Sequence, residues 1–548
     1  MTDDHLLDVR NLTVSFGPRG RRPAPVVDGV SLSISAGECL ALVGESGSGK
    51  SVTARTLIGL AGSDARVTAD RLQFGERDLL RLNESQWRRV RGQHIGFVLQ
   101  DALVSLDPLR TIGREIDDSL RLHTTMTRTQ RRQRVLQLLD DVGIPDPELR
   151  SRQRAGELSG GMRQRALIAA AIALEPALII ADEPTTALDV SIQSQILGVL
   201  ADLTSRGTAV LMISHDLSVV RNIADRVAVM RRGEIVESGT TQQALEQPRH
   251  EYTMALIRAV PAAHPRGQRL TTGERPTAVG PGSAASAAPV EPVLELTGVT
   301  KHFDTGAHAS FTAVDDVSLT VHAGKTLGMV GASGSGKTTT ARIALGLTRP
   351  DAGSVRLLGS PWVPLSEAQR RDRRSIIGAI YQDPFSSFDP RWNVGRLLAD
   401  ALTGGRSTRP GAHTERIAEL LQSVGLDPSL TNRRTRSLSG GQRQRVAIAR
   451  AIAPQPRVII CDEPVSSLDV SVQAQVLDLL DELQETLGLG YLFISHDLGV
   501  IRHISDTVVV MSDGRIVDAG HTGRVLDASE SLVHRPSDNM DSSHIQAP

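Results

Sequence analysis

The stretch LSGGMRQRALIAAAIALEPALIIADEPTTALD, residues 158–189, occurs a second time as LSGGQRQRVAIARAIAPQPRVIICDEPVSSLD, residues 438–469. Each copy contains a Ser-Gly-Gly turn before a helical pattern, an apolar strand that ends in Asp-Glu, and a short Leu-Asp loop. Adjacent glycines leave backbone N–H groups open to a phosphate, and the helix that follows directs its positive end to the same place. Open α/β sheets bind ligands at the carboxyl ends of their strands. Each copy therefore predicts a phosphate-binding turn beside two carboxylates.

The rest of the chain repeats at nearly the same spacing, which is 280 positions for the stretch quoted above. Lys50 and Lys337 are 287 positions apart, and His215 and His496 are 281 apart. A repeat of this length in 548 residues indicates a duplicated domain. We expect domain 1 over 1–261, a flexible linker over 262–291, domain 2 over 292–525 and a disordered tail over 526–548. The linker prediction rests on the Ala, Pro, Gly and Ser that dominate AAHPRGQRLTTGERPTAVGPGSAASAAPVE.

Each half contains a glycine-rich loop between a predicted strand and a predicted helix. GESGSGKS follows ECLALV, and GASGSGKT follows TLGMV. This is the context in which the P-loop pattern binds nucleotide phosphates through backbone N–H groups and a lysine. The chain has only four lysines, and two of them occupy these loops. The predicted nucleotide-binding residues are Gly44, Glu45, Ser46, Gly47, Ser48, Gly49, Lys50, Ser51 and Val52 in one half, and Gly331, Ala332, Ser333, Gly334, Ser335, Gly336, Lys337, Thr338 and Thr339 in the other.

Composition excludes several classes of partner. With 61 basic and 62 acidic residues the net charge is −1, so no global basic field attracts nucleic acid or anionic lipid. The acidic start MTDDHLLDVR predicts no signal peptide, and no apolar run is long enough for a membrane span. Cys39 and Cys461, each in an apolar run, are expected to be buried reduced thiols of a cytosolic protein.

Two further polar positions recur in both halves at strand ends. Gln100 and Gln382 follow apolar strands, and alone each would be read as a surface residue. Behind a P-loop, and at matching positions, they become candidate metal or water contacts. His215 and His496 end later strands, where a ring nitrogen could contact a terminal phosphate or simply cap the strand.

The order of these motifs, found twice, resembles the nucleotide-binding domains of ABC ATPases. The resemblance implies an α/β fold with two tandem P-loop ABC ATPase domains. Each domain would have a RecA-like core sheet, an antiparallel β subdomain and a helical insert. A narrower resemblance is to ATP-binding subunits of dipeptide, oligopeptide and nickel importers, carried by QDPFSSFDP, its looser copy QDALVSLDP, and PRHEYTMALIRAVP at 248–261. Met162 replaces the usual signature glutamine. Many of the oligopeptide-importer proteins that the chain resembles carry a cysteine cluster in this extension; residues 248–261 contain no cysteine, so the resemblance implies no iron–sulfur centre.

This resemblance implies a role for each matching residue. Glu183 and Glu463 would be the catalytic bases, with His215, His496, Gln100 and Gln382 completing the catalytic set. Mg²⁺ and ATP are the implied cofactors. The metal set is Ser51, Gln100, Asp182, Thr338, Gln382 and Asp462. Phe16 and Phe303 match the adenine-stacking position, although a lone Phe that ends a strand is more often core. Each ATP would also contact the Ser-Gly-Gly turn of the other domain, Ser159, Gly160 and Gly161 or Ser439, Gly440 and Gly441.

The resemblance implies an energy-coupling ATPase of a peptide importer at the cytoplasmic face of the cell membrane. Its partners would be two transmembrane permease subunits and an extracytoplasmic substrate-binding protein, with no nucleic acid. The cargo, whether peptide, nickel, glutathione or haem, stays open. An alternative is a tandem ABC protein that acts on ribosomes as a translation factor, although such proteins usually carry a long, charged, helical linker. An ATP-binding scaffold without hydrolysis is disfavoured by the intact Glu183 and Glu463.

Overall fold

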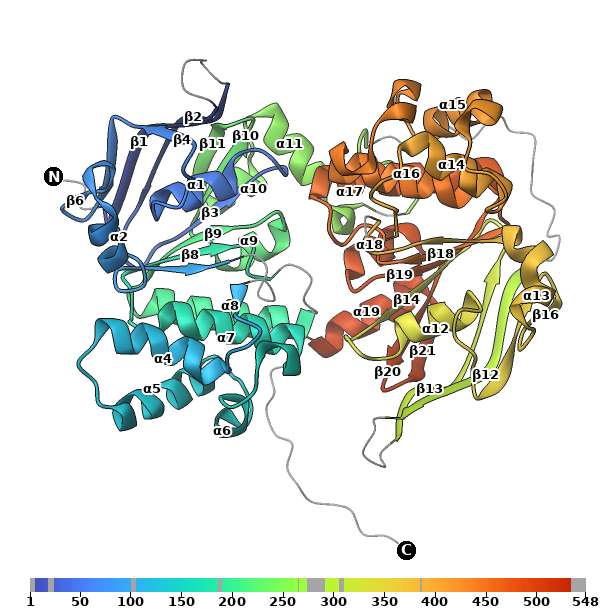
Figure 1. Cartoon of the computed structure of the whole chain (residues 1–548), viewed down its shortest axis with the longest axis horizontal. Coiled ribbons are helices and arrows are strands. Elements are labelled where there is room, and N and C mark those ends of the chain that lie inside the picture. The colour runs from blue at the N-terminus through green and yellow to red at the C-terminus, as the bar shows by residue number, and fades with distance from the viewer. Residues whose placement is uncertain are drawn as a thin grey trace, which may run out of the picture. The chain divides into compact units, whose positions relative to one another are not determined.

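The computed structural model describes residues 5–17, 24–99, 105–185, 190–264, 266–273, 291–304, 310–384 and 387–533. Contacts group the chain into two compact units: unit 1 contains Met1–Ala259 and Asp469–Ser471, and unit 2 contains the remainder. Each unit has a six-stranded core sheet, a smaller antiparallel sheet and a group of helices (Figure 1). The predicted fold class is confirmed.

The core sheet of unit 1 is parallel except for one edge strand. Its neighbours lie in the order β11-β10-β3-β9-β8-β7, and only β11 runs antiparallel to the strand beside it. The central strands β3, β8 and β9 are buried along their whole length, as expected when helices cover both faces of a parallel sheet. The bounds are β3 Cys39–Val43, β7 Ile95–Val98, β8 Leu178–Asp182, β9 Ala209–Ile213, β10 Arg226–Arg231 and β11 Glu234–Thr240.

The second sheet of unit 1 is antiparallel and begins the chain. β1 pairs with β2, β4 and β5, and alternating apolar residues of β1 face a core that it shares with the parallel sheet. The antiparallel pairing predicted for the first two strands is confirmed. The bounds are β1 Leu7–Phe16, β2 Pro25–Ile34, β4 Ala65–Thr68, β5 Arg71–Phe74 and β6 Arg77–Asp78.

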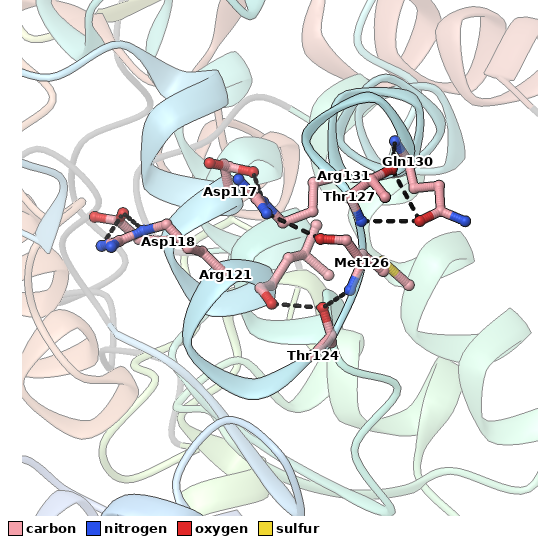
Figure 2. Close-up of polar contacts among 9 residues, drawn as sticks. Asp117, Asp118, Arg121, Thr124, Met126, Thr127, Gln130 and Arg131 are labelled. Carbon is pink, nitrogen blue, oxygen red and sulfur yellow. Dashed lines mark hydrogen bonds and ion pairs between the residues drawn. The ribbon is translucent and has the colours of Figure 1, made fainter.

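Helices α4–α6 form the predicted helical insert of unit 1, at the end opposite the antiparallel sheet (Figure 1). Figure 2 shows how the α4–α5 hairpin is held: Arg131 Nε donates to Asp117 Oδ1 at 2.7 Å, and Thr127 caps α5 together with Gln130. The helices of unit 1 are α1 Lys50–Leu57, α2 Glu84–Val90, α4 Ile112–His123, α5 Arg128–Asp141, α6 Pro147–Arg150, α7 Gly160–Ile172, α8 Val190–Ser205, α9 Leu217–Ile223, α10 Thr241–Glu246 and α11 Glu251–Arg258.

Unit 2 repeats this architecture. Its core sheet has the order β17-β18-β19-β14-β20-β21 and its antiparallel sheet the order β13-β12-β15-β16. The strands are β12 Pro292–Asp304, β13 Ser310–His322, β14 Thr326–Gly331, β15 Ala352–Leu357, β16 Ser360–Val363, β17 Ile377–Ile380, β18 Val458–Asp462, β19 Gly490–Ile494, β20 Thr507–Ser512 and β21 Arg515–His521. The helices are α12 Lys337–Ala344, α13 Glu367–Arg370, α14 Val394–Thr403, α15 Thr414–Ser423, α16 Gly440–Ile452, α17 Val470–Leu487, α18 Leu498–Ile504 and α19 Thr522–Val533.

Each core sheet closes with the hairpin predicted from an X-Gly pair. At the first turn Arg232 has φ 49° and Gly233 has φ 93°, and at the second Asp513 has φ 49° and Gly514 has φ 82°. Two successive positive φ values are typical of the type I′ turn, whose twist matches that of the flanking strands. The hairpin predictions are confirmed.

The predicted flexible linker is wrong for the described residues of 262–273. Pro261–Ala263 form a short 3₁₀ helix that contacts α18, and Leu270 is buried in unit 2. The Asp478 carboxylate accepts the Leu270 N–H at 2.8 Å and the Thr271 N–H at 3.0 Å. Arg266 also donates to Gln484 at 3.2 Å and pairs with Asp506. Composition did not reveal this because the partners that hold the segment are distant in sequence. The rest of the predicted linker, residues 274–290, lies outside the described residues.

The predicted tail boundary at 526 is also wrong. Helix α19 runs from Thr522 to Val533, and Leu526 is fully buried. Burial of an apolar side chain on unit 2 favours continuation of the helix past the expected end of the domain. Residues 534–548 lie outside the described part of the chain.

Candidate functional site

The P-loops stand where the sequence predicts them, between the first core strand of each unit and the helix that follows. Lys50 Nζ donates to the carbonyl oxygens of Gly44 at 2.7 Å and Glu45 at 2.8 Å. Lys337 Nζ makes the same two contacts in unit 2, with Gly331 and Ala332, at the same distances. The loop backbone therefore holds each ammonium group over the helix N-terminus.

Close packing explains the first glycine of each loop. Gly44 has φ 146°, and a Cβ built on it would lie 2.1 Å from the Met230 carbonyl oxygen. A Cβ on Gly331, at φ 156°, would lie 2.2 Å from the Met511 carbonyl oxygen. Backbone of β10 or β20 blocks these positions, so only glycine fits.

Strand β8 brings the first carboxylate to the P-loop hydroxyl. Ser51 Oγ donates to Asp182 Oδ1 at 3.0 Å, and Thr338 Oγ1 lies 3.5 Å from Asp462 Oδ1 in unit 2. Asp182 is 1% exposed, and burial raises the pKa of its carboxyl and that of Asp462. Asp182 Oδ2 is buried and has no hydrogen-bond partner among the residues that the structure describes. A hydroxyl beside a carboxylate with an unused oxygen fits Mg²⁺, which prefers one or two carboxylates together with phosphate oxygens.

The second carboxylate has an unusual backbone conformation in both units. Glu183 has φ 51° and Glu463 has φ 49°, in the left-handed region that side chains other than glycine rarely adopt. Each residue donates its N–H at 3.0 Å to the last residue of the neighbouring strand, Ile213 of β9 or Ile494 of β19. Such backbone strain is typical of functional sites. Because both units have this conformation, we infer that the fold fixes the orientation of this carboxylate.

The histidines contact these carboxylates. His215 Nδ1 lies 3.3 Å from Glu183 Oε1, and His496 Nδ1 lies 3.2 Å from Glu463 Oε1. Gln382 Nε2 donates to the other oxygen of Glu463 at 3.0 Å. The predicted His, Glu and Gln therefore lie together in unit 2. In unit 1 the His and Glu lie together, while Gln100 is outside the described residues.

The histidine–glutamate contact shifts the pKa of both partners in unit 2. Hydrogen bonding to Glu463 raises the pKa of His496 against the opposing effect of burial. Burial alone would raise the pKa of Glu463, but its contacts with His496 outweigh this and lower it. In unit 1 burial works to lower the pKa of His215, yet the hydrogen bond and charge of Glu183 raise it overall.

We expect His496→Gln to lower the unfolding temperature of unit 2 most at low pH. The folded-state pKa of His496 is above its unfolded value near 6.5. The His496–Glu463 pair therefore makes its full contribution to folding stability below about pH 6.5. That contribution falls as pH rises through the folded-state pKa. Removal of a hydrogen bond to a charged group should lower the unfolding temperature by an amount on the order of 5 °C at pH 6. Calorimetry of wild type and variant from pH 6 to pH 9 measures it; a difference that grows with pH would contradict the pairing.

The Ser-Gly-Gly turns open helices α7 and α16 as predicted. Ser159 Oγ accepts the N–H of Met162 at 3.3 Å, and Ser439 Oγ accepts that of Gln442 at 3.2 Å. Gln442 also accepts the Ser439 N–H at 3.1 Å, a reciprocal contact that the Met162 side chain lacks. The departure from the usual glutamine thus removes one capping contact and leaves the serine cap in place.

A model of the family described as "ABC transporter" matches residues 27–186 and 314–466, more than half of the chain. The chain belongs to the ABC transporter family. The matched segments cover both P-loops and both Asp-Glu strands, so the chain has two ATP-binding domains and is an ABC ATPase.

Its curated ABC relatives match along nearly the whole chain. The peptidoglycan transport ATP-binding protein YejF of Agrobacterium fabrum is 43% identical over 526 residues, 95% of this chain and 93% of the relative. The glutathione import ATP-binding protein GsiA of Escherichia coli K12 is 41% identical over 545 residues, 95% of this chain and 87% of the relative. Among solved structures, an archaeal ribosome recycling factor, aABCE1, is similar at TM-score 0.61 and 19% identity, over 97% of this chain and 96% of that one.

Phe16 and Phe303 match the adenine-stacking position of the family. They are 37% and 43% exposed, so neither is a core residue, and adenine stacking stays a prediction.

Sequence reasoning missed a contact in the first domain, between the Tyr252 hydroxyl and the Glu45 N–H. Tyr252 lies in the stretch at 248–261 that carries the family resemblance, but nothing in the sequence joined it to the P-loop.

No helix among the described residues of this ABC protein is long and apolar enough to cross a membrane.

Proposed function

We propose that this ABC ATPase supplies the energy for import of small peptide-like solutes. The observation that carries the proposal is the match to YejF, at 43% identity over 95% of this chain and 93% of that one. GsiA, matched to a similar extent, is named for import of glutathione, which is itself a short peptide. Peptidoglycan fragments and glutathione both contain amide-linked amino acids, so peptide-like cargo is the chemistry that the two relatives share.

We assign hydrolysis to the paired side chains in each unit. Glu183 and Glu463 would orient the attacking water and accept its proton, and His215 and His496 would hold the carboxylates and contact the terminal phosphate. Lys50 and Lys337 would bind the β- and γ-phosphates. Mg²⁺ would be held by Ser51 with Asp182 and by Thr338 with Asp462, with Gln100 and Gln382 as further contacts, and would neutralise charge on the phosphates.

We further propose that each ATP is bound by the P-loop of one domain and the Ser-Gly-Gly turn of the other, as in the family that the chain resembles. One loop alone surrounds a triphosphate with few donors, and a second set of backbone N–H groups would neutralise more of its charge. Ser159, Gly160 and Gly161 would serve the site at Lys337, and Ser439, Gly440 and Gly441 the site at Lys50. The Ser159→Cys, Gly334→Cys double variant should then form a disulfide faster with ATP bound than without it.

The proposed partners are two transmembrane permease subunits and an extracytoplasmic binding protein, with this chain at the cytoplasmic face of the membrane. Relatives named as ATP-binding proteins of transport systems support this arrangement. The translation-factor alternative gains little from the likeness to aABCE1, because 19% identity shows a shared fold only.

Uptake in cells that lack the gene for this protein tests the proposal. Cells supplied with the wild-type chain should accumulate a labelled dipeptide, glutathione or muropeptide, and cells supplied with the Glu183→Gln, Glu463→Gln double variant should not. Equal uptake of all three solutes by the two strains would overturn the function.

A further inference from the structure

We propose that Tyr252, which follows the core of domain 1, is a positioning residue for the P-loop of that domain and makes its ATP affinity depend on helix α11. The inference rests on assignment of an ATP site to Lys50. It adds a residue outside the recognised motifs and makes the two ATP sites unequal.

The Tyr252 hydroxyl is joined to the phosphate-binding lysine through one residue. Its Oη accepts the N–H of Glu45 at 3.0 Å, and the carbonyl of Glu45 accepts from Lys50 Nζ at 2.8 Å. Both backbone polar groups of Glu45 are thus engaged, the N–H by Tyr252 and the carbonyl by Lys50. The two residues in contact are 207 positions apart in sequence, so folding alone brings them together.

Helix α11 is held firmly enough to act as a support. Glu237 of β11 accepts the N–H groups of Arg249 at 2.7 Å and His250 at 3.2 Å, and His250 Nδ1 caps the helix by accepting the Tyr252 N–H at 3.0 Å. The Arg231 guanidinium lies 4.8 Å from the centre of the Tyr252 ring. The ring is 6% exposed, so the hydroxyl has a fixed direction.

The described residues of domain 2 contain no equivalent of this support. The chain contains three tyrosines, and the other two have different places: Tyr381 directly precedes Gln382, and the Tyr491 hydroxyl donates to the Leu480 carbonyl. Asp518, which occupies the β21 position matching Glu237, directs its carboxylate to the Ala519 N–H and to Arg524. The P-loop of domain 2 therefore holds Lys337 through Gly331 and Ala332, and neither of the other two tyrosines takes the place of Tyr252 there.

Removing the hydroxyl should weaken ATP binding in domain 1 only. In Tyr252→Phe the ring keeps its packing, but the Glu45 N–H loses its acceptor and the Gly44–Glu45 peptide that orients Lys50 can rotate. Loss of one neutral hydrogen bond corresponds to an increase of about two- to tenfold in the ATP concentration for half-saturation. The Lys337 site in the same chain is the internal control.

Photolabelling of the full chain with azido-ATP, followed by proteolysis that separates the two domains, resolves the two sites. We expect the ATP concentration for half-saturation of domain 1 to rise two- to tenfold in Tyr252→Phe and that of domain 2 to stay at the wild-type value. Glu237→Gln, which loosens the anchor of α11 and leaves the hydroxyl in place, should give a smaller shift in the same domain.

An unchanged domain 1 in Tyr252→Phe, or an equal shift in both domains, would overturn the inference. If wild-type domain 1 takes up no label, the ATP site itself is wrongly assigned. A variant that fails to fold would leave Glu237→Gln as the deciding measurement, and no shift in domain 1 there would also overturn it.

Discussion

Replacing Glu183 or Glu463 by Gln, one at a time, should strongly reduce steady-state ATP hydrolysis, and the two changes together should abolish it. An amide cannot accept the proton of the attacking water, and it has no negative charge to form an ion pair with the histidine that lies 3.2–3.3 Å from the carboxylate. Loss of a general base typically lowers turnover by about 10²- to 10⁴-fold. Phosphate release from purified full-length protein measures the effect, with ATP binding checked separately because the P-loops are unchanged.

Glu175→Gln is the matched control for these substitutions. Glu175 shares the left-handed conformation, with φ 51°, but it pairs with Arg134 at the surface and lies outside the site. The control should therefore hydrolyse ATP at the wild-type rate. If a single change at Glu183 or Glu463 left turnover untouched, that site would not be catalytic.

Gly44→Ala should destabilise unit 1 by about 3 to 5 kcal/mol. The new Cβ would lie 2.1 Å from the Met230 carbonyl oxygen, which belongs to the sheet backbone and cannot turn aside. Overpacking and an unfavourable φ each cost about 1–3 kcal/mol. Calorimetry should show the unfolding transition of unit 1 shifted down by about 10 °C, and that of unit 2 unchanged.

Gly156→Ala controls for the loss of a glycine as such. A Cβ at Gly156 meets nothing within 4 Å, and its φ is not positive, so we expect little change in stability. Equal stability of the Gly44→Ala and Gly156→Ala variants would show that the backbone of β10 does not lie close to the P-loop.

Local patterns predicted most of the fold and the site, because each unit contains short motifs with their own geometry. The glycine-rich loops, the Ser-Gly-Gly helix starts and the two Arg-Gly and Asp-Gly hairpins depend on neighbouring residues alone. The polar ends of β8 and β9 meet because parallel neighbouring strands end at one edge of a sheet. The duplication then gave each prediction twice.

The features that sequence missed depend on contacts between distant residues. Leu270 and Asp478 fix a segment whose composition reads as a flexible linker. The Tyr252 hydroxyl reaches a backbone N–H 207 positions away, and a backbone donor has no sequence signature. The left-handed φ of Glu183 cannot be predicted from the sequence either, because the Glu183 N–H donates to Ile213 of another strand.

The most direct test of the proposed function is the set of proteins that accompany this chain from its own cells. The full-length protein would be tagged, the membranes dissolved in mild detergent, and the captured partners identified by mass spectrometry. Permease subunits with several membrane spans should be enriched over a capture from cells expressing the tag alone. Enrichment of ribosomal proteins without any permease would contradict the importer and favour the translation factor.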